Sequence, residues 1–111
     1  MKKLLLLFVC SIWLVGCAEA TDKKDFNEAV DSMEAILDKE DWPQIQKHAE
    51  AISDIYNNSK WKLQLLGDED EYESLQEAVN DLKLAARQED KSECEKELTT
   101  IRTYLKQIYS L

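Results

Sequence analysis

Apolar side chains recur every three or four residues in four successive stretches of this 111-residue chain. This spacing places them on one face of an α-helix, and no stretch shows the alternation typical of a half-buried strand. Only two glycines and one proline interrupt the pattern, so we predict an all-α fold of long helices. The four apolar faces are Phe26, Ala29, Val30, Met33, Ile36 and Leu37; Ile45, Ala49, Ile52, Tyr56, Leu63 and Leu66; Tyr72, Leu75, Val79, Leu82 and Ala86; and Cys94, Leu98, Ile101, Leu105 and Ile108.

The breaks between these faces are only a few residues long. Asp41-Trp42-Pro43-Gln44 and Asp90-Lys91-Ser92-Glu93 are patterns typical of a helix start, and Gly67 is typical of a helix end. Short connections make consecutive helices antiparallel neighbours, so we predict a small up-down antiparallel bundle of three to four helices. Asn57-Asn58-Ser59 combines three poor helix formers, which leaves open whether the second helix is broken there.

The first residues have the composition of an export signal. Lys2 and Lys3 precede twelve mostly apolar residues, Leu4 to Val15, which are too few to span a bilayer. A short basic segment, a short apolar stretch and a small residue at the end together predict a secretory signal peptide.

The last four residues of this segment, Leu14-Val15-Gly16-Cys17, resemble the lipobox of bacterial lipoproteins. The resemblance implies that Leu14, Val15 and Gly16 are recognised by the signal peptidase and that Cys17 receives a diacylglyceryl group. It also implies that Cys17 becomes the acylated N-terminus, with long chains such as palmitate. We therefore expect a cleaved signal peptide over 1–16, a lipidated tether over 17–21 and one helical domain over 22–111. The expected location is the extracytoplasmic side of a cell membrane.

The charge of the expected mature chain restricts its partners. Once Lys2 and Lys3 are removed, 12 basic side chains face 23 acidic ones, a net charge of −11. Nucleic acid is then a poor partner, because its binding requires Lys and Arg to displace counterions. An anionic leaflet would also repel the domain, so attachment to the membrane has to come from the lipid on Cys17.

No single motif in the helical part is distinctive, but the order and spacing of several motifs indicate a family. They are Asp41-Trp42, Asp70-Glu71, Asp81-Leu82-Lys83, Asp90-Lys91-Ser92-Glu93, Glu97-Leu98 and Leu105-Lys106-Gln107-Ile108. From Trp42 to the end, the chain resembles the bacterial family called domain of unknown function 4363. The resemblance implies a small helical protein that is exported or attached to a membrane, and it implies no activity.

The sequence contains few residues that could form a catalytic site or a metal site. His48, the one histidine, lies at the edge of an apolar face without an evident acid–base partner, so we expect a boundary residue. The run Asp68-Glu69-Asp70-Glu71 does not match a calcium loop, because the sixth and twelfth positions from Asp68 are Glu73 and Val79. We expect these acids to complement the positive end of the third helix. No metal and no cofactor are predicted.

Cys94 is the one thiol that remains once Cys10 is cleaved off and Cys17 is lipidated. No intramolecular disulfide is then available. Since Cys94 shares a face with Leu98 and Ile101, we expect a small buried hydrophobic residue. An accessible thiol that pairs between chains is the alternative.

Three apolar residues lie off the predicted faces. Trp61 and Leu65 point nearly opposite to Leu63, and Leu84 lies behind the apolar face of the third helix. One interpretation is a wide apolar face that touches two neighbouring helices, or a second helix that bends at residues 57–59. The other is a small exposed patch near Gly67, and such patches mark contact sites for partners.

Together these features predict a lipid-anchored, non-catalytic accessory module for another membrane or envelope protein. Its expected partners are the membrane, through the lipid on Cys17, and an envelope protein that contacts Trp61, Leu65 and Leu84. The alternative is a binding protein that holds a small apolar ligand among its helices. We do not expect an enzyme.

Overall fold

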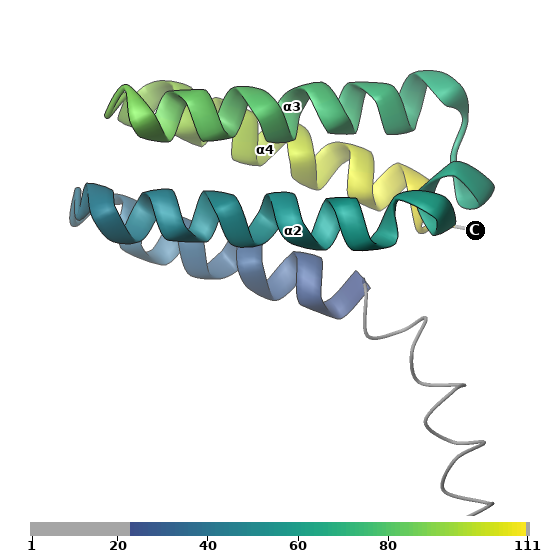
Figure 1. Cartoon of the computed structure of the whole chain (residues 1–111), viewed down its shortest axis with the longest axis horizontal. Helices are drawn as coiled ribbons and strands as arrows, with labels where there is room; N and C mark the ends of the chain where they lie inside the picture. The colour runs from purple at the N-terminus through teal and green to yellow at the C-terminus, as the bar shows by residue number, and fades with distance from the viewer. Residues whose placement is uncertain (1–22, 111) are drawn as a thin grey trace, which may run out of the picture.

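The structure, a computed structural model, describes residues 23–110, and these residues form four helices and no strand. An N-terminal helix covers 23–37, followed by α2 (Trp42–Leu66), α3 (Glu69–Arg87) and α4 (Lys91–Ile108). Consecutive helices run in opposite directions (Figure 1). The prediction of an all-α, up-down antiparallel bundle is confirmed, with four helices rather than three.

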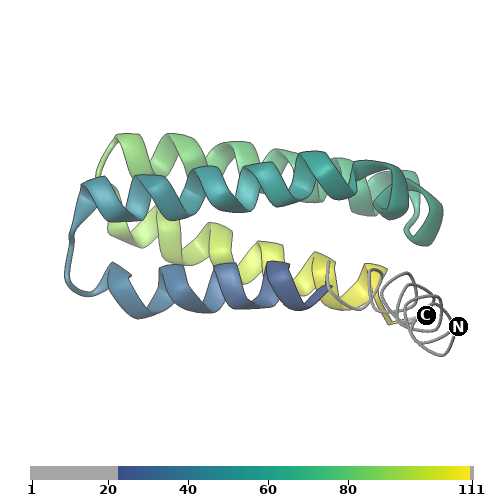
Figure 2. The same cartoon turned by 60° about the horizontal axis from the view of Figure 1, so that its bottom comes forward.

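The helices form a closed bundle in which each lies beside two others. α3 packs on both α2 and α4. The N-terminal helix lies between α2 and α4, as the two views in Figures 1 and 2 agree. Three features therefore share one end of the bundle: the first described residue of the N-terminal helix, Lys23, the α2–α3 turn at Gly67 and the end of α4.

The core contains the apolar face that the sequence predicts for each helix. Its largest fully buried side chains come from all four helices: Phe26, Val30, Met33, Ile45, Ile52, Tyr56, Leu63, Leu75, Leu82, Leu98, Ile101 and Ile108. Leu66 is an exception, because 38% of its surface is exposed. It lies in the last turn of α2, rotated about 60° from Leu63.

Side-chain caps start the helices where the sequence predicts them. The Asp41 carboxylate accepts a hydrogen bond from the Gln44 amide at 3.4 Å, and Asp90 accepts one from the Glu93 amide at 3.1 Å. At the start of α3 the Asp68 amide donates to Glu71 Oε1 at 2.9 Å. These contacts satisfy backbone groups that the first turn leaves without a helical partner.

α2 continues through Asn57-Asn58-Ser59 without a break. Tyr56 and Ser59 are buried, as is Leu63 one turn later, whereas both asparagines are exposed. Packing of Tyr56 and Leu63 thus holds the helix across residues that favour it poorly, since tertiary contacts override a weak local preference.

All three connections between the helices differ from what their residue types suggest. Gly67 has an ordinary negative φ, and a Cβ atom there would meet Ile108 Cγ1 at 2.9 Å, so the glycine allows a close approach. In the connections at the other end of the bundle, the left-handed residues are Glu40 and Glu89, with φ of 52° and 55°. The left-handed region favours glycine, so no sequence pattern indicated these two conformations.

Candidate functional site

Two of the predicted contact residues, Trp61 and Leu65, lie exposed on the last two turns of α2. Their exposed fractions are 59% and 77%. Each is rotated about 160° from buried Leu63, in opposite senses, so the two share the outer side of the helix. Leu66 joins them, and with Lys62 the three line a small surface hollow. We call Trp61, Leu65 and Leu66 the α2 patch.

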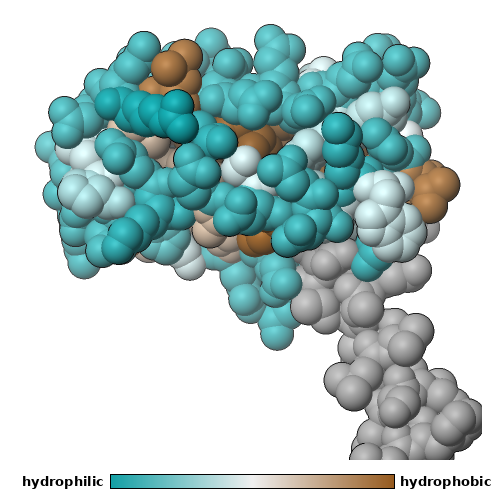
Figure 3. All heavy atoms as spheres, in the orientation of Figure 1, coloured by the Kyte–Doolittle hydropathy of each residue, from teal (hydrophilic) through white to brown (hydrophobic). Residues whose placement is uncertain are grey.

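The surface around the α2 patch is mostly hydrophilic. Hydrophobic side chains appear in several separate areas of the visible face, and one of these areas lies at the end of the bundle where α2 ends (Figure 3). The ammonium group of Lys62 lies 5.3 Å from the centre of the Trp61 ring, an arrangement that the face of an aromatic ring favours.

Leu84, the third predicted contact residue, is also exposed but lies elsewhere. Its exposed fraction is 51%. The ion pairs of its neighbours Lys83 and Arg87 with Glu50 place it level with Glu50 of α2. Glu50 precedes Trp61 by eleven residues, or about 16 Å along the helix axis. The three predicted residues therefore do not form one surface, because antiparallel pairing carries Leu84 toward the opposite end of the bundle.

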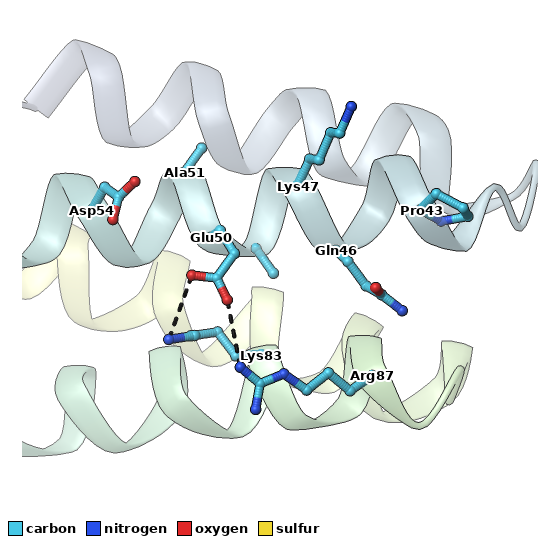
Figure 4. Close-up of a pocket in the computed structure, with 9 residues that line it drawn as sticks. Pro43, Gln46, Lys47, Glu50, Ala51, Asp54, Lys83 and Arg87 are labelled. Carbon is cyan, nitrogen blue, oxygen red and sulfur yellow. Dashed lines mark ion pairs between the residues drawn. The ribbon is translucent and has the colours of Figure 1, made fainter.

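A hollow of about 480 Å³ lies between α2 and α3 on the outside of the bundle. Among the residues that line it, the carboxylate of Glu50 faces Lys83 and Arg87 at 3.6 Å each (Figure 4). Gln46 Nε2 donates to the carbonyl of Ala86 at 3.3 Å on the same side. These contacts join α2 to α3, and the two cations already share the one carboxylate between them.

The profile of the protein family described as Domain of unknown function (DUF4363) matches residues 19–111. The chain belongs to this family. The match begins before Trp42, where the motifs in the sequence indicated it, and so includes the N-terminal helix. Comparison of the chain with curated proteins and with solved structures finds no significant match.

His48 and the acidic residues at the start of α3 are the titratable groups of this DUF4363 chain that the sequence singled out among residues 23–110. His48 is half-buried, as expected of a boundary residue. No group of three or more histidine, cysteine or acidic side chains in this range is placed to hold a metal ion. Glu69, Asp70 and Glu71 occupy the first turn of α3, where negative charge complements the helix dipole.

Cys94 is fully buried in the DUF4363 core, which confirms the expected hydrophobic role. Burial, together with the charges of Asp90, Glu93 and Glu95, raises the pKa of its thiol to about 11. A buried thiol that stays protonated is a poor nucleophile. The alternative of an accessible thiol that pairs between chains is wrong for this structure.

Glu97 is the notable buried group that sequence reasoning missed. It lies on α4 with only 6% of its surface exposed. Desolvation raises the pKa of its carboxyl group, and the nearby carboxylates of Asp81 and Glu93 raise it further. The sequence contained a weak indication, since Glu97 directly precedes buried Leu98 on the apolar side of α4.

Several predicted features lie outside the described residues. They are the signal peptide, the recognition residues Leu14, Val15 and Gly16, the lipidation site Cys17 and the tether over 17–21. Within residues 23–110, no helix combines the length and the apolar character needed to cross a membrane.

Proposed function

We propose that this DUF4363 protein is a lipid-anchored, non-catalytic module of the bacterial cell envelope, held through Cys17 and facing the extracytoplasmic side. The proposal is supported by Leu14-Val15-Gly16-Cys17 and by the short distance in sequence from Cys17 to the first described helical residue, Lys23. In this proposal the folded domain binds another component of the envelope and does not catalyse a reaction.

The observation that carries this proposal is the α2 patch. A protein with a net charge of −11 after removal of Lys2 and Lys3 has ample polar surface, yet Trp61 and Leu65 stay largely exposed while the core is complete without them. Exposed apolar residues that cluster on a charged domain are typical of an interaction site. We therefore propose an accessory role, in which the module contacts another component of the envelope.

No observation on the described residues favours the alternative of an apolar ligand. The four helices bury a continuous set of apolar side chains. The hollow between α2 and α3 lies on the outside of the bundle, and Lys47, Glu50 and Arg87 are among the residues that line it. A site for a small apolar ligand would instead enclose most of the ligand's surface.

The lipid anchor is tested by Cys17→Ser in the full-length protein, expressed in a bacterium that processes lipoproteins. We expect the wild-type protein to be found in the membrane fraction, with the mass of its N-terminal peptide raised by the acyl chains. C17S should lose this mass, because serine lacks the sulfur that carries the diacylglyceryl group. Cys94→Ala is the matched control, since it removes the other mature cysteine and should keep the lipid.

A wild-type protein without added mass on Cys17 would contradict the anchor. The accessory role is tested in the same preparation, by gentle purification and mass spectrometry of bound molecules. A stoichiometric envelope protein would identify the contacted component as a protein. An empty monomer from its own membranes would leave the lipid bilayer as that component, and a small molecule bound in the bundle would favour the ligand-binding alternative.

A further inference from the structure

The α2 patch lies at the end of the bundle where the chain enters it. Up-down topology places Lys23, Gly67 and Ile108 at this end (Figures 1 and 2). A Cβ atom at Gly67 would lie only 2.9 Å from Ile108 Cγ1, so the α2–α3 turn and the end of α4 are in direct contact. Trp61, Leu65 and Leu66 occupy the two turns before Gly67.

The distance from the proposed lipid to the domain is short. Six peptide units connect Cys17 to Lys23, and even a fully extended chain of this length spans only about 20 Å. If Cys17 carries the lipid, Lys23 is held within this distance of the bilayer surface. The patch lies at the same end of the bundle as Lys23, so it can then reach the headgroups.

We propose that the α2 patch inserts into the interfacial region of the lipid bilayer to which Cys17 anchors the chain. This inference rests on the proposed function and names the partner of its contact surface. Tryptophan suits this region because its ring is apolar and its N–H group is polar. Lys62 lies over the Trp61 ring and can extend its ammonium group toward the lipid phosphates.

Size favours a membrane over a protein at this patch, and charge disfavours a second copy of this chain. A stable protein interface takes about 800 Å² and 20–30 residues from each partner, whereas the patch consists of three side chains at one helix end. A second copy of this acidic chain would also be repelled. The acidic residues Glu69, Asp70 and Glu71 follow the patch directly, so insertion should be deeper in neutral lipid than in anionic lipid.

Two tryptophans in the mature chain provide a probe and its control. Trp61 belongs to the patch, and Trp42 begins α2 at the other end of the bundle, about 28 Å away along the helix axis. Trp42→Phe leaves Trp61 as the single tryptophan of the mature chain, and Trp61→Phe leaves Trp42. Both variants are purified as lipidated full-length proteins and inserted into phosphatidylcholine vesicles with acyl chains brominated near the headgroups.

We expect the Trp61 emission to shift to shorter wavelength and to lose most of its intensity in brominated vesicles. The Trp42 emission should keep its intensity. Replacement of Leu65 by Glu should restore the Trp61 emission, because a charge then has to enter the interface. Leu84→Glu is the matched control, since Leu84 is also exposed but lies away from the patch. Helix content measured by circular dichroism confirms that each variant is folded.

Equal Trp61 emission in brominated and ordinary vesicles would overturn the inference while the added mass on Cys17 still supports the anchor. Protection of Trp61 from acrylamide in native membranes, without quenching by brominated lipid, would assign the patch to an envelope protein instead. A purified full-length chain without lipid on Cys17 would overturn both the anchor and the membrane contact.

Discussion

Cys94 and Glu97 show at the scale of single residues how burial decides the character of a side chain. They lie three residues apart on α4, and both are buried. The thiol suits an apolar site and stays neutral. Burial removes water from the carboxyl group of Glu97, and the carboxylates of Asp81 and Glu93 lie near it. Both effects disfavour the charged form of Glu97.

Glu97→Gln should therefore stabilise the protein at neutral pH. We expect the free energy of unfolding at pH 7 to rise by about 0.5–1 kcal/mol, because the amide is neutral and fills nearly the same volume. Urea unfolding followed by circular dichroism measures this change. Glu95→Gln is the control, since Glu95 lies exposed on the same helix and its replacement should have little effect.

The pH dependence of the free energy of unfolding, measured for the wild-type protein and E97Q, tests whether the buried charge of Glu97 is the cause. The pKa of Glu97 is raised in the folded state from 4.5, so the folded protein binds more protons than the unfolded chain between 4.5 and the raised value. Its contribution to stability is then complete below pH 4.5 and is lost as the pH rises through the folded-state pKa. The advantage of E97Q should consequently disappear toward pH 4.5. A constant difference between pH 7 and 4.5 would contradict this account.

At the scale of elements, local patterns and packing act together in α2. Asp41 caps its start, whereas its middle contains Asn57 and Asn58, which favour a helix poorly. The helix is continuous because the buried residues on either side anchor it to the core. The exposed asparagines therefore lower the stability of the helix without changing its path.

Replacement of both Asn57 and Asn58 by alanine should stabilise the protein. Each exchange improves helix propensity at an exposed interior position, and we expect a combined gain of about 1 kcal/mol in the free energy of unfolding. Glycine at both positions should lower it instead. The measurement is thermal and urea unfolding of the domain. If neither pair of substitutions changed stability, α2 would not be a regular helix at residues 57–58.

At the scale of the whole molecule, the closure of the bundle depends on contacts between the first and last helices. Arg102 of α4 donates to both carboxylate oxygens of Glu34, from Nε at 3.0 Å and from Nη2 at 2.8 Å, and it also bonds to Asp31. Lys91 of α4 pairs with Asp38 at 3.1 Å. This protein is acidic, so Arg102 and Lys91 offset the repulsion between carboxylates where α4 lies beside the N-terminal helix.

Arg102→Gln should loosen this closure. We expect a loss of about 1 kcal/mol in the free energy of unfolding, since the bidentate pair is partly exposed but belongs to a network. The loss should shrink in about 1 M NaCl, where the screening length is about 3 Å. Lys24→Gln is the matched control, because Lys24 pairs with Glu28 within one helix at 3.8 Å. Equal losses for both variants would contradict the role of Arg102 in joining helices.

The sequence by itself determined where the helices lie and which face of each is buried, because helical spacing and capping are local properties of neighbouring residues. It also determined the expectation of a lipid on Cys17, which depends on four consecutive residues. The tertiary structure decided the rest. It exposed Leu66, buried Glu97, paired Arg102 with the first helix and separated Leu84 from Trp61. Each of these outcomes depends on which residues of neighbouring helices lie opposite the side chain concerned. These neighbours are set only when the four helices pack into a bundle.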